Sequence, residues 1–379
     1  MELRPVSLGE LLVSYFGGEN MSTPQLAHKE ELTPLERIGL ALQYKKPDRV
    51  PVAPLVCGAS RRVLGVTYDK WAKSSEIAAN SLLAAQELIE FDGFLTLVDL
   101  SVEAADFGQE VIFPENSTPY PNFDNPLIKT HEDYYKIKKV DPRKSPRMSM
   151  VIDLVRRLAQ AKGKTVALLG FVYGPLGVLS QMRAHEALFK DIIRRPEAVQ
   201  HAVRVINESL LEYVRAQVEA GAHGVVIDPL FSSASILHRN TWSKFEGKET
   251  NELASAIRGA GGLVVVHNCG NGVYFEDVIE HANPIAISHA YPAFGSPTWT
   301  DHAAKWGRKV VTIGYSDPAQ TGHVLSQEAI LEDCKNQIET FKSSEGGFIL
   351  STGCEFAPGG NLLSAATMVK AARLYGSYQ

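Results

Sequence analysis

An imidazole and a thiol stand two residues apart in the stretch HNCGNG, at positions 267–272. The apolar run 262–266 precedes them and is typical of a buried strand. Side chains two residues apart on a strand point to the same face, so His267 and Cys269 can act on the same target. By itself the pair is compatible with packing, a disulfide, a nucleophile pair or half of a metal site.

A third group of matching chemistry, Cys354, ends another apolar run, GFILSTGC at 347–354. One imidazole and two thiolates suit zinc, and three protein ligands leave a fourth position open, as in catalytic zinc sites. If the two runs are strands that face each other across a barrel mouth, we expect His267, Cys269 and Cys354 to form such a site. A Cys269–Cys354 redox pair is the alternative. A Cys/His acyl-transfer site is disfavoured because no oxyanion-hole pattern accompanies the residues.

Eight short apolar runs alternate with stretches long enough for helices, which predicts parallel strands. We expect a (β/α)8 TIM barrel with an N-terminal helical extension, and a doubly wound open sheet is the competing architecture. The insertion 101–164 is rich in proline and should extend over the barrel mouth. The predicted strands are 50–56, 93–100, 165–174, 224–231, 262–269, 284–291, 309–316 and 347–354.

The chain divides into an N-terminal arm, residues 1–46, and a barrel domain, residues 47–379. The arm has a short apolar core at 11–16 but neither a basic start nor a small-residue cleavage site, so we do not interpret it as a signal peptide. We expect it to pack on the barrel or on a partner subunit, which leaves a homo-oligomer possible.

Ionisable residues recur where the apolar runs stop, and in such barrels the reactive groups stand at the C-terminal strand ends. We therefore predict catalytic roles for Glu103, Asp228 and His289, as groups that orient ligands or donate protons. A strand-end cap or a structural ion pair is the alternative for each. Glu355 directly follows a proposed ligand and is a candidate to approach the metal.

The overall composition excludes several classes of function. The net charge of −5 does not resemble a nucleic-acid binder, and no apolar run approaches the roughly 18 residues of a membrane span. Four cysteines in 379 residues do not form a disulfide framework. We therefore expect a cytoplasmic protein, in which Cys57 and Cys334 are packing residues.

Several stretches resemble the uroporphyrinogen decarboxylase superfamily and, within it, the corrinoid-dependent, zinc-containing methyltransferases. The pairing of H-x-C with a late G-C is the specific part of the resemblance. The other matches are modest and are spread over 47–379. The stretches are PDRVPVAPLVCGASRRVLG (47–65), GFLTLVDLSVEAADFG (93–108), GPLG (174–177), VVIDPLFSS (225–233), VVVHNCGN (264–271), IGYSDPAQT (313–321) and STGCEFAPGGN (351–361).

The resemblance implies a zinc enzyme that moves a methyl group to or from a corrinoid. We expect O-demethylation, in which methyl passes from an aryl methyl ether to the Co(I) corrinoid of a partner protein, because aromatic residues recur in the loops near the predicted mouth. No D-x-H-x-x-G pattern is present, so the corrinoid should be carried by a separate protein.

Three alternatives stay open. The first is methyl transfer from a methyl-corrinoid protein to a thiol such as coenzyme M. The second is a uroporphyrinogen-type decarboxylase, which is disfavoured because Arg61 and Arg62 are adjacent rather than spaced and because a decarboxylase has no use for the thiols. The third is a non-enzymatic zinc-responsive protein, which requires a closed site with four protein ligands.

Overall fold

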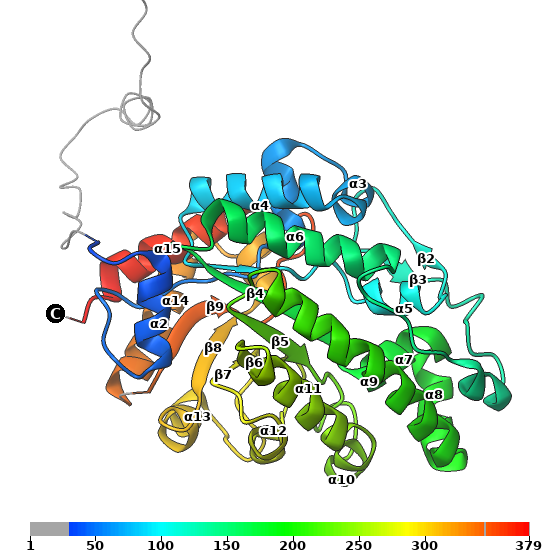
Figure 1. The fold of residues 1–379 in the computed structure, drawn as a ribbon. Coiled ribbons are helices and arrows are strands. Elements are labelled where there is room, and N and C mark those ends of the chain that lie inside the picture. Colours follow the sequence, from blue (N-terminus) through cyan, green and yellow to red (C-terminus); the bar gives the residue numbers. More distant parts are fainter. Residues whose placement is uncertain (1–29, 345, 379) are drawn as a thin grey trace, which may run out of the picture.

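The computed structural model describes residues 30–344 and 346–378, and the apolar core of the arm at 11–16 lies outside them. Seven parallel strands form one curved sheet in the order β1-β4-β5-β6-β7-β8-β9. Helices follow the strands and surround the sheet (Figure 1). These features confirm the predicted TIM-barrel architecture. The strands are β1 (Gly93–Leu95), β2 (Val111–Ile112), β3 (Tyr120–Pro121), β4 (Ala167–Tyr173), β5 (Gly224–Asp228), β6 (Leu263–Asn268), β7 (Ala286–His289), β8 (Val311–Ser316) and β9 (Phe348–Thr352).

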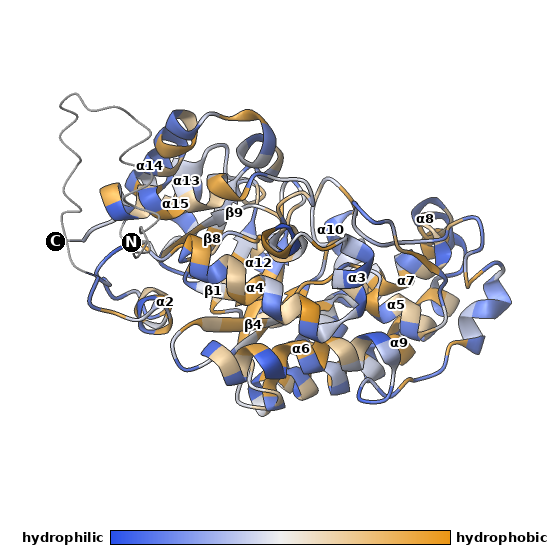
Figure 2. Ribbon diagram, turned by 90° about the horizontal axis from the view of Figure 1, so that it is seen from above, coloured by the Kyte–Doolittle hydropathy of each residue, from blue (hydrophilic) through white to orange (hydrophobic). Residues whose placement is uncertain are grey.

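The helices alternate with the strands as predicted. Figure 2 shows both hydrophilic and hydrophobic residues on helices such as α6, as expected for elements with one face on the sheet and one in water. The helices are α2 (Pro34–Leu42), α3 (Tyr68–Lys73), α4 (Ser75–Ile89), α5 (Val102–Asp106), α6 (Pro146–Lys162), α7 (Pro175–Arg183), α8 (His185–Arg194), α9 (Pro196–Glu219), α10 (Arg239–Trp242), α11 (Lys248–Gly259), α12 (Phe275–Ala282), α13 (Trp299–Trp306), α14 (Gln327–Ser343) and α15 (Leu362–Tyr375). Short 3-10 or π segments are η1 (Cys57–Leu64), η2 (His131–Lys136), η3 (Ser243–Gly247) and η4 (Gln320–Val324).

The eighth position of the barrel is filled by an irregular segment, the predicted strand 50–56. Ala53 N–H donates to Leu350 on one side, and the Val52 carbonyl accepts from Asp92 N–H on the other. Pro51 and Pro54 have no N–H to donate, so the segment makes only isolated strand pairing. The segment therefore bridges β9 and β1 without forming a regular strand.

The strand β1 is shorter than the predicted 93–100, so part of the β4 edge has no partner strand. Side chains accept the backbone N–H groups along that part of the edge. Phe171 N–H donates to Oε1 of Gln217, and Tyr173 N–H donates to Oε1 of Glu103. The first of these acceptors comes from α9 and the second from α5. The insertion 101–164 includes α5, the short β2–β3 pair and α6. The β2–β3 pair and α5 lie with α7 and α8 at one end of the barrel, and α6 runs along its side (Figure 1).

The helix α2 lies at the opposite end, where the strands begin (Figure 1). Thr33 caps it with a capping box completed by Glu36, and Pro34 occupies its first turn. Leu35 N–H donates to the Thr165 carbonyl just before β4. This helix falls inside the 1–46 range that we assign to the arm, and it packs directly on the barrel.

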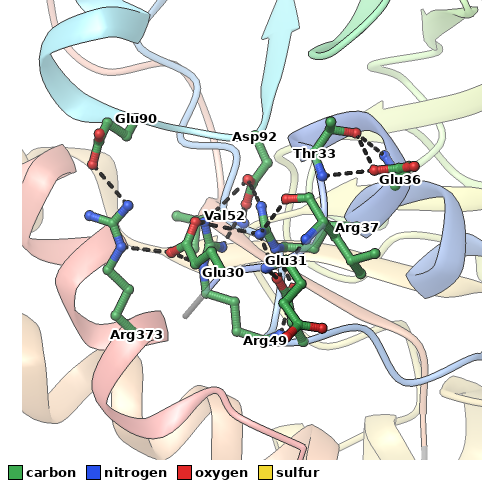
Figure 3. Close-up of polar contacts among 12 residues, drawn as sticks. Glu30, Glu31, Thr33, Glu36, Arg37, Arg49, Val52, Glu90, Asp92 and Arg373 are labelled. Atoms are coloured by element: carbon green, nitrogen blue, oxygen red, sulfur yellow. Dashed lines mark hydrogen bonds and ion pairs between the residues drawn. The ribbon is translucent and has the colours of Figure 1, made fainter. Parts of the chain in front are cut away.

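A buried ion network joins α2 to the barrel (Figure 3). The guanidinium of Arg37 is fully buried and pairs with Asp48 at 2.7 Å and with Asp92 at 2.7 Å. Asp92 also pairs with Arg49 at 2.8 Å and accepts the Val52 N–H at 2.7 Å. Glu30 pairs with Arg49 at 2.9 Å. The network holds the irregular segment beside β1 and thereby closes the barrel.

The network predicts loss of stability in acid. Burial raises the pKa values of Glu30 and Asp48, but hydrogen bonds from Arg49 and Arg37, respectively, outweigh it and lower both pKa values to about 2. Both values lie below those of an unfolded chain, so this stabilisation is complete above about pH 4.5 and is lost as the pH falls towards 2. Urea unfolding at pH 7, 4 and 3 should show a falling free energy of unfolding. The fall should be smaller in Glu30→Gln, and an equal fall in that variant would contradict the assignment.

Candidate metal centre

The structure brings together three side chains from two distant parts of the chain. His267 lies on β6. Cys269 is the first residue after β6, and Cys354 is the second residue after β9. One ligand atom from each lies within 4.8 Å of the others. Among the described residues, these three form the one group of at least three His, Cys, Asp or Glu side chains whose ligand atoms lie close enough together to hold a metal ion.

The ring of His267 is buried and oriented by a neighbouring strand. Its Nδ1 lies 3.0 Å from Oγ of Ser288, the residue that faces it in register on β7. That contact leaves the other ring nitrogen to serve as a ligand, which is how a supporting hydrogen bond fixes a metal-binding tautomer. The alternation of side chains along β7 could have identified Ser288 as the inward-facing residue. Ser288 precedes His289 on the strand and therefore points to the opposite face.

The electrostatics of the three groups reflect their mutual contact. Burial lowers the pKa of His267, but its hydrogen bond to Cys354 and the nearby Asp228 carboxylate together raise it above the ordinary value. The hydrogen bond between the thiols lowers the pKa of Cys269 and raises that of Cys354.

The donor set fits zinc. Two thiols and one imidazole are ligands that zinc commonly takes, and three of them leave a place for a reactant. Asn268, which lies between two members of the set, points away as its position on the strand predicts. Its amide donates to the carbonyls of Pro229 and Leu230 at 3.0 Å each and so holds the loop after β5.

Removal of the supporting hydroxyl should weaken metal binding. Because Ser288 orients the ring of His267, Ser288→Ala should reduce zinc affinity about 10- to 100-fold. Competition with a chromophoric chelator measures this, and Ser288→Thr, which keeps a hydroxyl, should retain most of the affinity. Equal affinities in the wild type and Ser288→Ala would remove the assigned role.

Asp228, predicted to act in catalysis, lies beside the metal centre at the end of β5. Its side chain is 3% exposed, and its Oδ1 has no hydrogen-bond partner among the described residues. Burial raises its pKa to about 6, with His267 acting in the opposite direction. An unpaired buried carboxyl oxygen is costly unless it has a ligand or a function.

Glu103 is outside the group of three ligands and contacts the end of β4. Its Oε1 accepts the Tyr173 N–H at 3.0 Å, so the side chain completes the edge of β4. Burial raises its pKa to about 8. The contact with Tyr173 fits a strand-end cap, but Oε2 has no hydrogen-bond partner among the described residues, so the catalytic role of Glu103 stays a prediction.

His289 faces the helices rather than the centre of the barrel. Its ring lies 4.9 Å from that of Phe275, 5.2 Å from that of Trp299 and 4.7 Å from that of His302. Its Nδ1 contacts the Tyr291 carbonyl at 2.8 Å. Burial lowers its pKa to about 4, so the ring is neutral at physiological pH. The structure therefore does not bring His289 to the metal centre.

Glu355 turns towards the loop at η1. Its Oε1 accepts the Gly58 N–H at 3.1 Å and lies 3.5 Å from the Tyr68 hydroxyl. Arg61 and Arg62 extend from the same loop and donate to the carbonyls of Pro358 and Gly359. These contacts fix the segment that carries Cys354.

Glu246 is a buried residue that the strand-end pattern does not predict, and it fixes the segment beside Asp228. Its carboxylate accepts the Leu176 N–H and the indole N–H of Trp242, each at 2.9 Å. It thereby caps the first turn of α7, next to Gly174, whose N–H donates to the Asp228 carbonyl at 2.9 Å. Because Glu246 lies in η3 and caps α7, its role can be identified only from the packing of these two distant segments.

A family model described as uroporphyrinogen decarboxylase (URO-D) matches residues 33–375. The chain belongs to the URO-D family. Family members with different activities are similar to it. The methylcobamide:CoM methyltransferase MtaA of Methanosarcina barkeri is 22% identical over 345 residues, which cover 86% of this chain and 94% of the relative. The uroporphyrinogen decarboxylase of Wolinella succinogenes is 24% identical over 311 residues, covering 79% and 86%.

Among solved structures, a methyltransferase from Methanosarcina mazei superposes with a TM-score of 0.76. It is 20% identical, and the match covers 90% of this chain and 98% of the other. At this identity the superposition shows the fold. The TIM barrel predicted from the strand pattern is thus shared with this methyltransferase along most of its length.

Proposed function

We propose that this URO-D protein is a zinc-dependent methyltransferase that exchanges a methyl group between a small molecule and the corrinoid of a separate protein. The observation that carries the proposal is the convergence of His267, Cys269 and Cys354 within 4.8 Å. An enzyme that only decarboxylates has no use for two thiols and an imidazole at the barrel mouth. Arg61 and Arg62 also donate to main-chain carbonyls, which argues against a clamp for substrate carboxylates.

The metal would be held by His267, Cys269 and Cys354. When bound, zinc would supply Lewis acidity to a thiol or an ether oxygen of the substrate. Ser288 would fix the ring of His267, and the buried Oδ1 of Asp228 would accept or donate the proton of the reacting group.

The direction of transfer favoured first is methylation of a thiol. In this reaction a thiol and a methyl-corrinoid give a methyl thioether, a Co(I) corrinoid and one proton. The similarity to the methylcobamide:CoM methyltransferases MtaA and MtbA supports this direction.

O-demethylation of an aryl methyl ether is the second candidate. It consumes a proton as the methyl group passes to Co(I), and the unpaired oxygen of Asp228 is placed to hold one. Some aromatic residues near the strand ends pack against other aromatic rings, however. Tyr315 stacks on Trp299 at 3.4 Å, and Phe231 packs on Phe189 of α8 at 5.8 Å. The aromatic support for this substrate is therefore weaker than the sequence suggests.

The corrinoid protein would dock over the mouth. Large apolar side chains are exposed in the segments that follow the barrel strands, including the β2–β3 pair, and such exposure marks interaction surfaces. The residues are Leu64, Ile112, Tyr120, Phe123, Tyr291, Phe294, Val324 and Leu363.

A cobalamin spectrum tests the proposal. Zinc-loaded protein is mixed with methylcobalamin and 2-mercaptoethanesulfonate, or with Co(I) cobalamin and guaiacol, and the cobalt absorption bands are followed. Loss of methyl-Co(III) with the thiol supports the first candidate, and formation of methyl-Co(III) with guaiacol supports the second. No change in either mixture, also after addition of corrinoid proteins from methylotrophic relatives, would refute methyl transfer.

A further inference from the structure

A cavity of about 120 Å³ lies inside the barrel on the other side of His267 from the thiols. Three successive inward residues of β6, Leu263, Val265 and His267, line it, so it extends along about 13 Å of the strand. The helix α2 covers its far end with Leu35 and Ile38. The cavity therefore runs from the start of the strands to the layer of the metal centre.

The lining is almost entirely aliphatic, and its polar groups are already engaged. His267 and Ser288 contact each other, and Nδ1 of His223 accepts the Leu168 N–H at 3.0 Å. Burial lowers the pKa of His223, which favours its neutral ring. A buried water needs two to four polar partners, and in this lining the Ser288 hydroxyl alone keeps hydrogen-bonding capacity beyond its contact with His267. The chemistry thus favours an apolar occupant.

We propose that this cavity is a binding site for a small apolar molecule, of the size of benzene or a short alkyl chain. Its volume is close to that of the engineered cavity of about 150 Å³ that stays dry and binds benzene. Entry is possible beside α2, where the side chain of Leu263 is 40% exposed. The occupant would contact the ring of His267 from below, which links the cavity to the metal centre. This site is distinct from the methyl-transfer site and does not depend on the proposed function.

Benzene titration of the metal-free protein, followed by methyl NMR, tests the inference. Benzene should shift the methyl resonances of Ile38, Val265 and Ile313, which line the cavity, together with the imidazole resonances of His267. Phenol at equal concentration should bind at least tenfold more weakly, because its hydroxyl would lose its hydrogen bonds to water. Absence of saturable shifts in these residues up to the solubility limit of benzene would overturn the proposal.

Cavity-filling variants supply the matched control. Ala167 and Ala53 line the cavity, so Ala167→Leu or Ala53→Leu should weaken benzene binding at least tenfold. Ala304, on the exposed face of α13, is remote from it, and Ala304→Leu should leave the affinity unchanged. Two filling variants are used because either one can overpack the core. If both fold and bind benzene as the wild type does, the ligand lies elsewhere and the proposal fails.

Discussion

Replacement of Cys354 by alanine is expected to abolish zinc binding and methyl transfer together. The thiol lies within 4.8 Å of the ligand atoms of His267 and Cys269, and two remaining ligands cannot hold the ion tightly. Metal analysis should fall from about one zinc per chain to near zero, and Cys269→Ala should behave in the same way. The activity is measured with the methyl acceptor found in the cobalamin experiment.

The control is a cysteine that is buried elsewhere in the core. Cys334 lies in α14, fully buried in the core and outside the metal centre. Cys334→Ala should keep its zinc and its activity, with at most a modest loss of stability. A Cys354→Ala protein that is folded by circular dichroism and still binds one zinc would show that the three residues are not the ligands.

Replacement of Asp92 by alanine should have the largest effect on stability. Asp92 is fully buried and pairs with Arg37 and Arg49, so its removal takes one carboxylate partner from each of two buried guanidinium groups, which keep only Asp48 and Glu30. Breaking a buried pair in this way costs about 3–5 kcal/mol. The substitution also removes the acceptor of the Val52 N–H, which holds the segment that closes the barrel. Urea unfolding measures the loss.

An exposed ion pair gives the comparison. Glu186 and Lys190 pair on the surface of α8 with side chains 85% and 57% exposed. Glu186→Ala should therefore change the free energy of unfolding by less than about 1 kcal/mol. If Asp92→Ala were no more destabilising than Glu186→Ala, the network at the base of the barrel would have no role in closing it.

The sequence by itself determined the barrel and the donor set of the candidate metal centre. Alternating apolar runs and helical stretches depend on local periodicity, so seven predicted strands are present, although β1 is shorter than its run. The eighth, 50–56, became an irregular segment because of its two prolines. The spacing of His267 and Cys269 on one strand face also follows from local geometry alone.

Only the tertiary structure decided which strand-end residues meet. The strand pattern predicts that Asp228, Glu103 and His289 stand near the mouth, but the side chain of each then depends on neighbours that are distant in sequence. Asp228 lies beside His267, Glu103 completes the edge left by a short β1, and His289 packs among aromatic rings of α12 and α13. The hydroxyl that orients His267 and the apolar cavity beneath it arise from packing between several strands. Local periodicity cannot predict such contacts, because each forms only between strands and helices of the closed barrel.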